Sequence, residues 1–165
     1  WMFLDWMLDG KPTAVGASIG LVVGLICITP GAGYVTVGSS MIMCLIAAII
    51  SNLGSRALLK IKGFDDTLGV FACHGLGGFT GAVLTGLFAS KVVNSAIPSE
   101  GLFIAGDHKL FIANLTSVTV VAIYSMVATY VIVKVVGICT PIRVSEKEED
   151  AGLDISMHGE HVSGS

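Results

Sequence analysis

Long hydrophobic stretches alternate with short polar segments along this 165-residue chain. The first stretch, from Pro12 to Ser55, contains no Asp, Glu, Lys or Arg. A helix crosses the hydrocarbon core of a bilayer in about 20 residues, so this stretch is long enough for two crossings. The segment Thr29-Pro30-Gly31-Ala32-Gly33-Tyr34 interrupts it with residues that end helices. The pattern therefore predicts two membrane-spanning helices, at residues 13–30 and 34–55.

Two further spans are predicted downstream, which makes the chain an all-α, polytopic membrane protein. The third, residues 67–89, follows a basic segment, and the fourth, residues 110–138, follows a polar, turn-rich loop. The fourth is longer than one crossing requires, which tilting or extension into solvent accommodates. Residues 1–9 contain two tryptophans, typical of a membrane boundary, and are interpreted as the end of a preceding transmembrane helix. A surface amphipathic helix is the alternative for them. Residues 139–165 are expected to form a tail.

Composition supports a membrane protein and argues against a soluble domain. The chain is 53% hydrophobic and 13% charged, whereas soluble domains carry roughly 25% charged residues. Gly16, Gly20 and Gly24 form a small-residue stripe that favours close helix packing. No basic patch predicts a nucleic-acid partner. The four cysteines are scattered without a C-x-x-C pair, so neither a metal site nor a redox pair is expected.

The distribution of Lys and Arg predicts the orientation of the chain. Basic residues are enriched in cytoplasmic loops. With the tail in the cytoplasm, seven basic residues lie inside: Lys11, Arg56, Lys60, Lys62, Lys134, Arg143 and Lys147. Only Lys91 and Lys109 then lie outside. We therefore expect a multi-pass protein of the cell membrane with a cytoplasmic C-terminus.

His74 is the principal candidate for chemistry. It is the only His, Asp, Glu, Lys or Arg of the third predicted span. An ionisable residue at membrane depth usually marks a pathway for a substrate, ion or proton. Gly75, Gly77 and Gly78 remove side chains from its surroundings, which favours a conduction role over an imidazole satisfied by a neighbouring helix. A neutral imidazole offers one donor and one acceptor to a small polar molecule.

Asp65 and Asp66 directly precede the third span, and either is well placed to cap its N-terminus. Asp66 precedes His74 by eight residues, a rise of about 12 Å along a helix. This separation rules out a direct hydrogen bond, so Asp66 is expected to cap the helix or shape a pore entrance. The chain shows no nucleophile–base set, phosphate-binding loop or cofactor motif, and an enzyme is not expected. His158 and His161 in the tail are interpreted as solvated, with metal binding as the alternative.

Several motifs together resemble those of one family. The motif Asp65-Asp66-Thr67-Leu68-x-Val70-Phe71-x-x-His74-Gly75-x-Gly77-Gly78 resembles the signature of the ammonium transporter (Amt/MEP/Rh) family. Three other stretches agree in order: Gly10-Lys11-Pro12-Thr13, Ile28-Thr29-Pro30-Gly31-Ala32-Gly33-Tyr34-Val35, and Gly152-Leu153-Asp154-Ile155-Ser156-x-His158-Gly159-Glu160. The last stretch and Thr-Pro-x-x-Gly-Tyr favour the Amt branch. The match covers essentially the whole chain.

This resemblance implies a fold and a function. The chain would be the C-terminal portion of an eleven-helix fold with inverted repeats, assembled as a homotrimer in the bilayer. Its substrate would be ammonium or ammonia, with methylammonium as an analogue and no cofactor. His74 would be one of two paired histidines in a hydrophobic pore, with Val70 and Phe71 as further pore-lining residues. Gly152, Leu153 and Asp154 would belong to a regulatory tail on which a cytoplasmic regulator docks.

Two other classes of function are alternatives to transport. The same fold could act as an ammonium sensor that signals through its cytoplasmic tail. A small membrane subunit with His74 as a haem ligand is the third class. Robust uptake would argue against a pure sensor, and a colourless purified protein would argue against haem.

Overall fold

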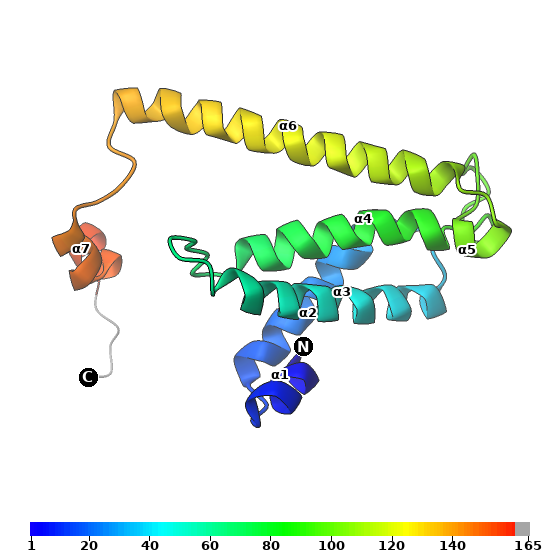
Figure 1. The fold of residues 1–165 in the computed structure, drawn as a ribbon, viewed down its shortest axis with the longest axis horizontal. Helices are drawn as coiled ribbons and strands as arrows, with labels where there is room; N and C mark the ends of the chain where they lie inside the picture. The colour runs from blue at the N-terminus through cyan, green and yellow to red at the C-terminus, as the bar shows by residue number, and fades with distance from the viewer. Residues whose placement is uncertain (161–165) are drawn as a thin grey trace. The chain divides into compact units, whose positions relative to one another are not determined.

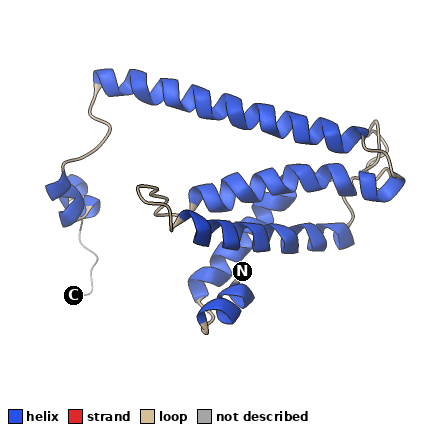
Figure 2. Cartoon of the chain, viewed as in Figure 1, coloured by secondary structure: helices blue, strands red, loops and turns tan. Residues whose placement is uncertain are grey.

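The computed structural model describes residues 1–160, and helices dominate them (Figures 1 and 2). Within this range no strand forms, and the single β-bridge pairs Val35 with Ala89. The chain forms two compact units that divide between Val120 and Val121. Four helices are long and apolar enough to cross a membrane. The prediction of an all-α, polytopic membrane protein is confirmed.

The first unit begins with a short helix and a long one. Helix α1 covers Met2–Asp9, and α2 covers Ala14–Ile28. The side-chain oxygen of Thr13 accepts the N–H of Gly16 at 2.9 Å and thereby caps α2. A 3₁₀ turn, η1 (Thr29–Gly31), continues directly from α2. This helical stretch thus ends at Gly31, close to the predicted limit of residue 30.

The second span lies three residues further along the chain than the pattern predicts. Helix α3 covers Val37–Leu58, where the prediction was 34–55. Thr36 begins the helix because its side-chain oxygen accepts the N–H of Ser39 at 3.2 Å. Its C-terminal end extends past Arg56. The absence of charge marks the apolar part of this helix, whereas capping determines where it begins.

The third span begins later than predicted, at a widened turn. The π-helical turn η2 (Phe71–Leu76) continues as α4 (Gly77–Phe88), where the prediction was 67–89. Gly69 precedes it with a φ of 64°, a left-handed conformation that glycine adopts readily. The chain therefore turns before the helix begins, and Asp66 lies in the loop that precedes it.

The remaining elements are α5 (Leu102–Ala105), the 31-residue α6 (Lys109–Cys139), α7 (Glu146–Ala151) and the π turn η3 (Asp154–His158). Ser145 and Glu148 form a capping box at the start of α7. The Ser145 N–H and hydroxyl both donate to Glu148 Oε2, at 2.8 and 2.7 Å, and lower the pKa of that carboxyl. His161, part of the predicted tail, lies outside the described residues.

Helices α2, α3 and α4 pack together and form the core of the first unit (Figure 1). Its buried side chains are Val23, Cys27, Val35, Met43, Ala47, Cys73 and Leu84. The closest approach is at Gly81 of α4, where a Cβ atom would overlap the carbonyl of Cys27 in α2. Backbone therefore packs against backbone at this crossing. Such contact gains dispersion energy that bulkier residues would prevent.

A polar cluster joins α1 to the C-terminal part of α3. The Asp5 carboxylate is buried and accepts hydrogen bonds from Asn52 Nδ2 at 2.8 Å and Arg56 Nη2 at 2.7 Å. Arg56 also donates to Asn52 and pairs with Asp9, and this pairing lowers the pKa of the Asp9 carboxyl. Gly16 faces Asp5, where a side chain would overlap the carboxylate. The buried charge of Asp5 is therefore neutralised and hydrogen-bonded.

The Gly81 contact leads to a stability prediction. We expect Gly81→Ala to destabilise the full-length protein by about 1–3 kcal/mol, because the new methyl group must displace the backbone of α2. Gly38→Ala is the matched control, since nothing lies within 4 Å of a Cβ there. Thermal unfolding in detergent measures both variants. A melting temperature for Gly81→Ala equal to that of Gly38→Ala would contradict the proposed packing.

The polar cluster leads to a second stability prediction. Arg56→Gln should destabilise the protein by about 1–3 kcal/mol, because the buried Asp5 loses its cationic partner. Asp9→Asn should have a smaller effect, because the Asp9 side chain is 52% exposed. The same unfolding experiment compares them. An equal loss of stability in the two variants would show that the buried Asp5–Arg56 pair stabilises the protein no more than the exposed Asp9–Arg56 pair does.

Candidate functional site

His74 lies in the η2 turn and is exposed within this chain, between two pockets. The first, which we call the Pro30 pocket, has a volume of about 440 Å³ and is lined by Ile26, Thr29, Pro30, His74, Gly78 and Ala82. The second, the Ser18 pocket, has a volume of about 200 Å³ and is lined by Ser18, Ile19, Val22, Leu68, Val70, Cys73 and His74. His74 is the only residue that lines both.

The two pockets follow one face of α2. Ile19, Val22 and Ile26 line them at spacings of three and four residues, which places their side chains in a row along the helix. On the other side, His74 and Gly78 are four residues apart and also share a face. The lining is mostly apolar. The arrangement is two mostly apolar pockets with one imidazole in the lining of both.

Asp66 holds the start of the helix that carries His74. Its Oδ1 accepts the N–H of Val70 at 2.7 Å, and its Oδ2 accepts those of Phe71 at 2.9 Å and Ala72 at 3.3 Å. N–H groups of a first helical turn have no partner within the helix, and a carboxylate is well suited to accept them. Asp65 instead accepts the hydroxyl of Thr67 at 2.6 Å. Of these two aspartates, Asp66 accepts backbone N–H groups of the helix and Asp65 accepts the Thr67 hydroxyl.

Val70 and Phe71, which the family resemblance suggests as pore-lining residues, have different surroundings in the structure. Val70 lines the Ser18 pocket together with His74. Phe71 lines neither pocket, and its ring packs edge-to-face on Phe64 with centroids 6.2 Å apart. Its other neighbour is Gly75, close enough that a Cβ there would lie 3.1 Å from the ring. Phe71 therefore supports the turn through these contacts, and its place in a pore lining stays a prediction.

Sequence reasoning did not single out the α2 wall. The wall residues Ser18, Ile19, Val22, Ile26 and Thr29 share a helical spacing, but every face of an apolar helix shows such a spacing. What distinguishes this face of α2 is His74, which lies in η2 and lines the same pockets. Only the packing of α2 against η2 and α4 brings them together.

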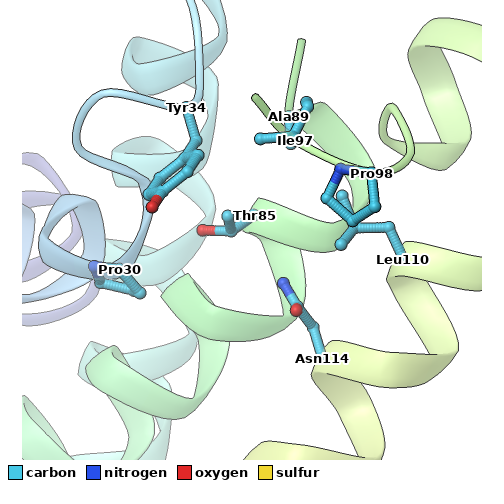
Figure 3. A pocket seen from close by; sticks show the side chains of 8 residues that line it. All are labelled: Pro30, Tyr34, Thr85, Ala89, Ile97, Pro98, Leu110 and Asn114. Atoms are coloured by element: carbon cyan, nitrogen blue, oxygen red, sulfur yellow. The ribbon is translucent and has the colours of Figure 1, made fainter. Parts of the chain in front are cut away.

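A third pocket lies apart from His74, between the end of α4 and the start of α6 (Figure 3). It has a volume of about 210 Å³ and is lined by Pro30, Tyr34, Thr85, Ala89, Ile97, Pro98, Leu110 and Asn114. The Thr85 hydroxyl donates to the Gly81 carbonyl at 2.8 Å, and the Asn114 amide donates to the Ala82 carbonyl at 3.2 Å. These donors are thus already paired with backbone, and this pocket contains none of the predicted site residues.

The tail segment forms its own local structure in the second unit. Gly152 has a φ of 88° and separates α7 from Leu153, which directly precedes η3. The Ser156 hydroxyl contacts the carbonyls of Gly152 at 2.9 Å and Glu148 at 3.2 Å, and the Asp154 carbonyl accepts the N–H of Glu160. Residues 1–160 contain no group of three or more His, Cys, Asp or Glu side chains that could hold a metal ion.

The chain matches known proteins along almost its whole length. Residues 1–163 match the family model described as Ammonium Transporter Family. An "Ammonium transporter" of Bacillus subtilis (strain 168) is 41% identical over 160 residues, which cover 97% of this chain and 39% of that protein. An "Ammonium transporter" of Aquifex aeolicus (strain VF5) is 43% identical over 161 residues, covering 97% and 37%. The chain thus spans less than half the length of these relatives.

A solved structure agrees with the sequence comparisons. The crystal structure of Candida albicans Mep2 matches with a TM-score of 0.78 and 36% identity, over 90% of this chain and 33% of that one. Fold, motifs and sequence therefore point to the same family. The predicted resemblance is confirmed, and the chain belongs to the Ammonium Transporter Family.

Proposed function

We propose that the complete protein moves ammonium or ammonia across a membrane and that His74 lies on the conduction path. The observation that supports this most directly is the position of His74 between the Pro30 and Ser18 pockets. Relatives described as ammonium transporters support the choice of substrate. Methylammonium, which differs from ammonium by one methyl group, serves as its analogue.

The lining of the path suggests which form of the substrate passes His74. An apolar wall raises the free energy of a charged ammonium ion strongly, and that of neutral ammonia much less. A neutral imidazole can accept a hydrogen bond from ammonia on one nitrogen or donate to its lone pair from the other. Transfer of ammonia past His74 therefore keeps one polar contact along an otherwise apolar path.

The wider setting of this path is also part of the proposal. In the complete protein, a second histidine from the remainder of the fold pairs with His74, and three copies form a homotrimer in the cell membrane. The tail with Gly152, Leu153 and Asp154 lies in the cytoplasm and binds a regulator. The excess of basic residues on the tail side of the predicted topology supports this orientation.

The first test is substitution of His74 in the full-length protein. His74→Ala should lower methylammonium uptake by about tenfold or more, because the path loses the contact of the His74 imidazole, worth more than about 1.4 kcal/mol in the transition state. Uptake of labelled methylammonium in cells without endogenous ammonium uptake measures it at matched membrane expression. His108→Ala is the control, because His108 lies in a loop and lines neither pocket.

The outcomes of this test separate the candidate functions. Equal uptake by the parent and His74→Ala would show that His74 is not on the path. A parent protein that binds ammonium without transporting it would instead favour an ammonium sensor that signals through the tail. Loss of uptake in both His74→Ala and His108→Ala would indicate a general defect.

Asp66 provides a second test, because we propose that it holds the His74 helix in place at the pore entrance. Asp66→Ala leaves three backbone N–H groups without their acceptor, which should destabilise the protein by about 1–3 kcal/mol and reduce uptake. Asp65→Ala is the matched control, since Asp65 contacts only the Thr67 hydroxyl. Thermal unfolding and uptake are measured together. The capping role fails if Asp65→Ala is as damaging as Asp66→Ala.

A further inference from the structure

Behind His74, a buried hydrogen bond joins α3 to the η2 turn. The hydroxyl of Ser51 donates to the backbone carbonyl of Ala72 at 2.6 Å. Ser51 is 0% exposed and Ala72 is 1% exposed, so water reaches neither group. Ser51 lines none of the pockets described above and is not part of the family motif in η2.

The carbonyl of Ala72 lies where regular helical pairing is interrupted. In a π turn the backbone is widened, and its hydrogen bonds join residues five apart instead of four. A buried carbonyl without a partner destabilises the fold, most of all in an apolar surrounding. Side chains of neighbouring helices commonly donate to backbone carbonyls at such places. In this protein Ser51 donates to the Ala72 carbonyl.

A second contact from α3 holds the other end of the same turn. Gly54 lies one helical turn after Ser51, and a Cβ atom there would overlap the side chain of Leu76. Leu76 therefore packs into the space that Gly54 leaves open. Helix α3 thus contacts residues 72 and 76, which are two positions before and after His74.

This spacing determines which way His74 points. Residues two apart in a helical turn lie on roughly opposite sides of its axis. When residues 72 and 76 face α3, His74 must face away from α3, towards the Pro30 and Ser18 pockets. The neighbour of Ser51, Asn52, donates to Asp5, so the position of α3 is itself anchored.

We propose that Ser51 is a positioning residue for His74: its hydroxyl, bonded to the Ala72 carbonyl, fixes the π turn that directs the imidazole onto the conduction path. This inference rests on the proposed transport function. It predicts that removing the hydroxyl loosens the turn and lowers the rate of transport, although Ser51 itself touches no substrate.

Hydrogen exchange tests the first half of the proposal without relying on transport. In full-length Ser51→Ala, amides of the segment 72–77 should exchange about tenfold faster than in the parent, as expected for loss of one buried hydrogen bond. Thr85→Val is the matched control, because it also removes a buried hydroxyl that donates to a carbonyl, that of Gly81. It should leave segment 72–77 unchanged. Unaltered exchange in Ser51→Ala would overturn the proposal.

Transport kinetics test the second half. Ser51→Ala should lower the maximal rate of methylammonium uptake about three- to tenfold with less than about a twofold change in KM, because the loss of one hydrogen bond affects the orientation of His74 and not substrate recruitment. Ser51→Cys, which keeps a weak donor of similar size, should recover part of the rate. Thr85→Val should transport like the parent. An equal loss in Thr85→Val, or no recovery in Ser51→Cys, would point to a general packing defect and overturn the role.

Failure of the underlying function is recognised separately. An inactive parent protein, or a His74→Ala variant that transports normally, would refute the transport function and the role of Ser51 together. When the parent is active and His74→Ala is impaired, normal uptake by Ser51→Ala overturns this inference alone.

Discussion

Backbone groups in an apolar surrounding need hydrogen-bond partners within the protein, and the helix that carries His74 depends on two such partners. The Asp66 carboxylate accepts three N–H groups at its beginning, and the Ser51 hydroxyl donates to the Ala72 carbonyl within the π turn. Neither contact comes from α4 itself. The site is therefore built by the loop before the helix and by the helix behind it, and the imidazole remains unobstructed.

Close packing at a small residue determines the position of the α2 wall, which lies opposite His74. Because Gly81 lacks a side chain, the backbone of α2 approaches α4 at Cys27. The face of α2 that contains Val22 and Ile26 then lies beside His74, and the two pockets form along it. We expect a larger residue at the crossing to separate the helices and widen the two pockets. Their dimensions therefore depend on a contact that does not line them.

Charge is kept at the ends of the apolar segments. Asp5, Asp9 and Arg56 neutralise one another where α1 meets α3, and Asn52 completes the hydrogen bonding. Glu148 and Arg143 serve the tail in a similar way, through the α7 capping box and an ion pair with Glu149. Between these ends, the imidazole of His74 faces an apolar wall. An ionisable side chain in apolar surroundings is unusual, and this is why His74 is the candidate site residue.

Much of this arrangement could be predicted from the sequence. The all-α class and four apolar segments follow from hydropathy, because a membrane-spanning helix needs a long uncharged run. His74 and Asp66 can be recognised for a related reason. Ionisable residues are rare in or beside membrane-spanning segments, because burying a charge there costs free energy, so those that occur usually have a structural or functional role. Family motifs along residues 1–163 then identify the family.

Other features required the tertiary structure. Helix α3 and the η2 turn begin three and four residues after the predicted positions, because Thr36, Gly69 and Asp66 end the preceding loops through hydrogen bonds and backbone conformation that hydropathy does not register. The α2 wall and the contact from Ser51 to Ala72 join segments far apart in the chain. In an apolar helix all faces look alike in sequence, and only packing decides which face meets the histidine.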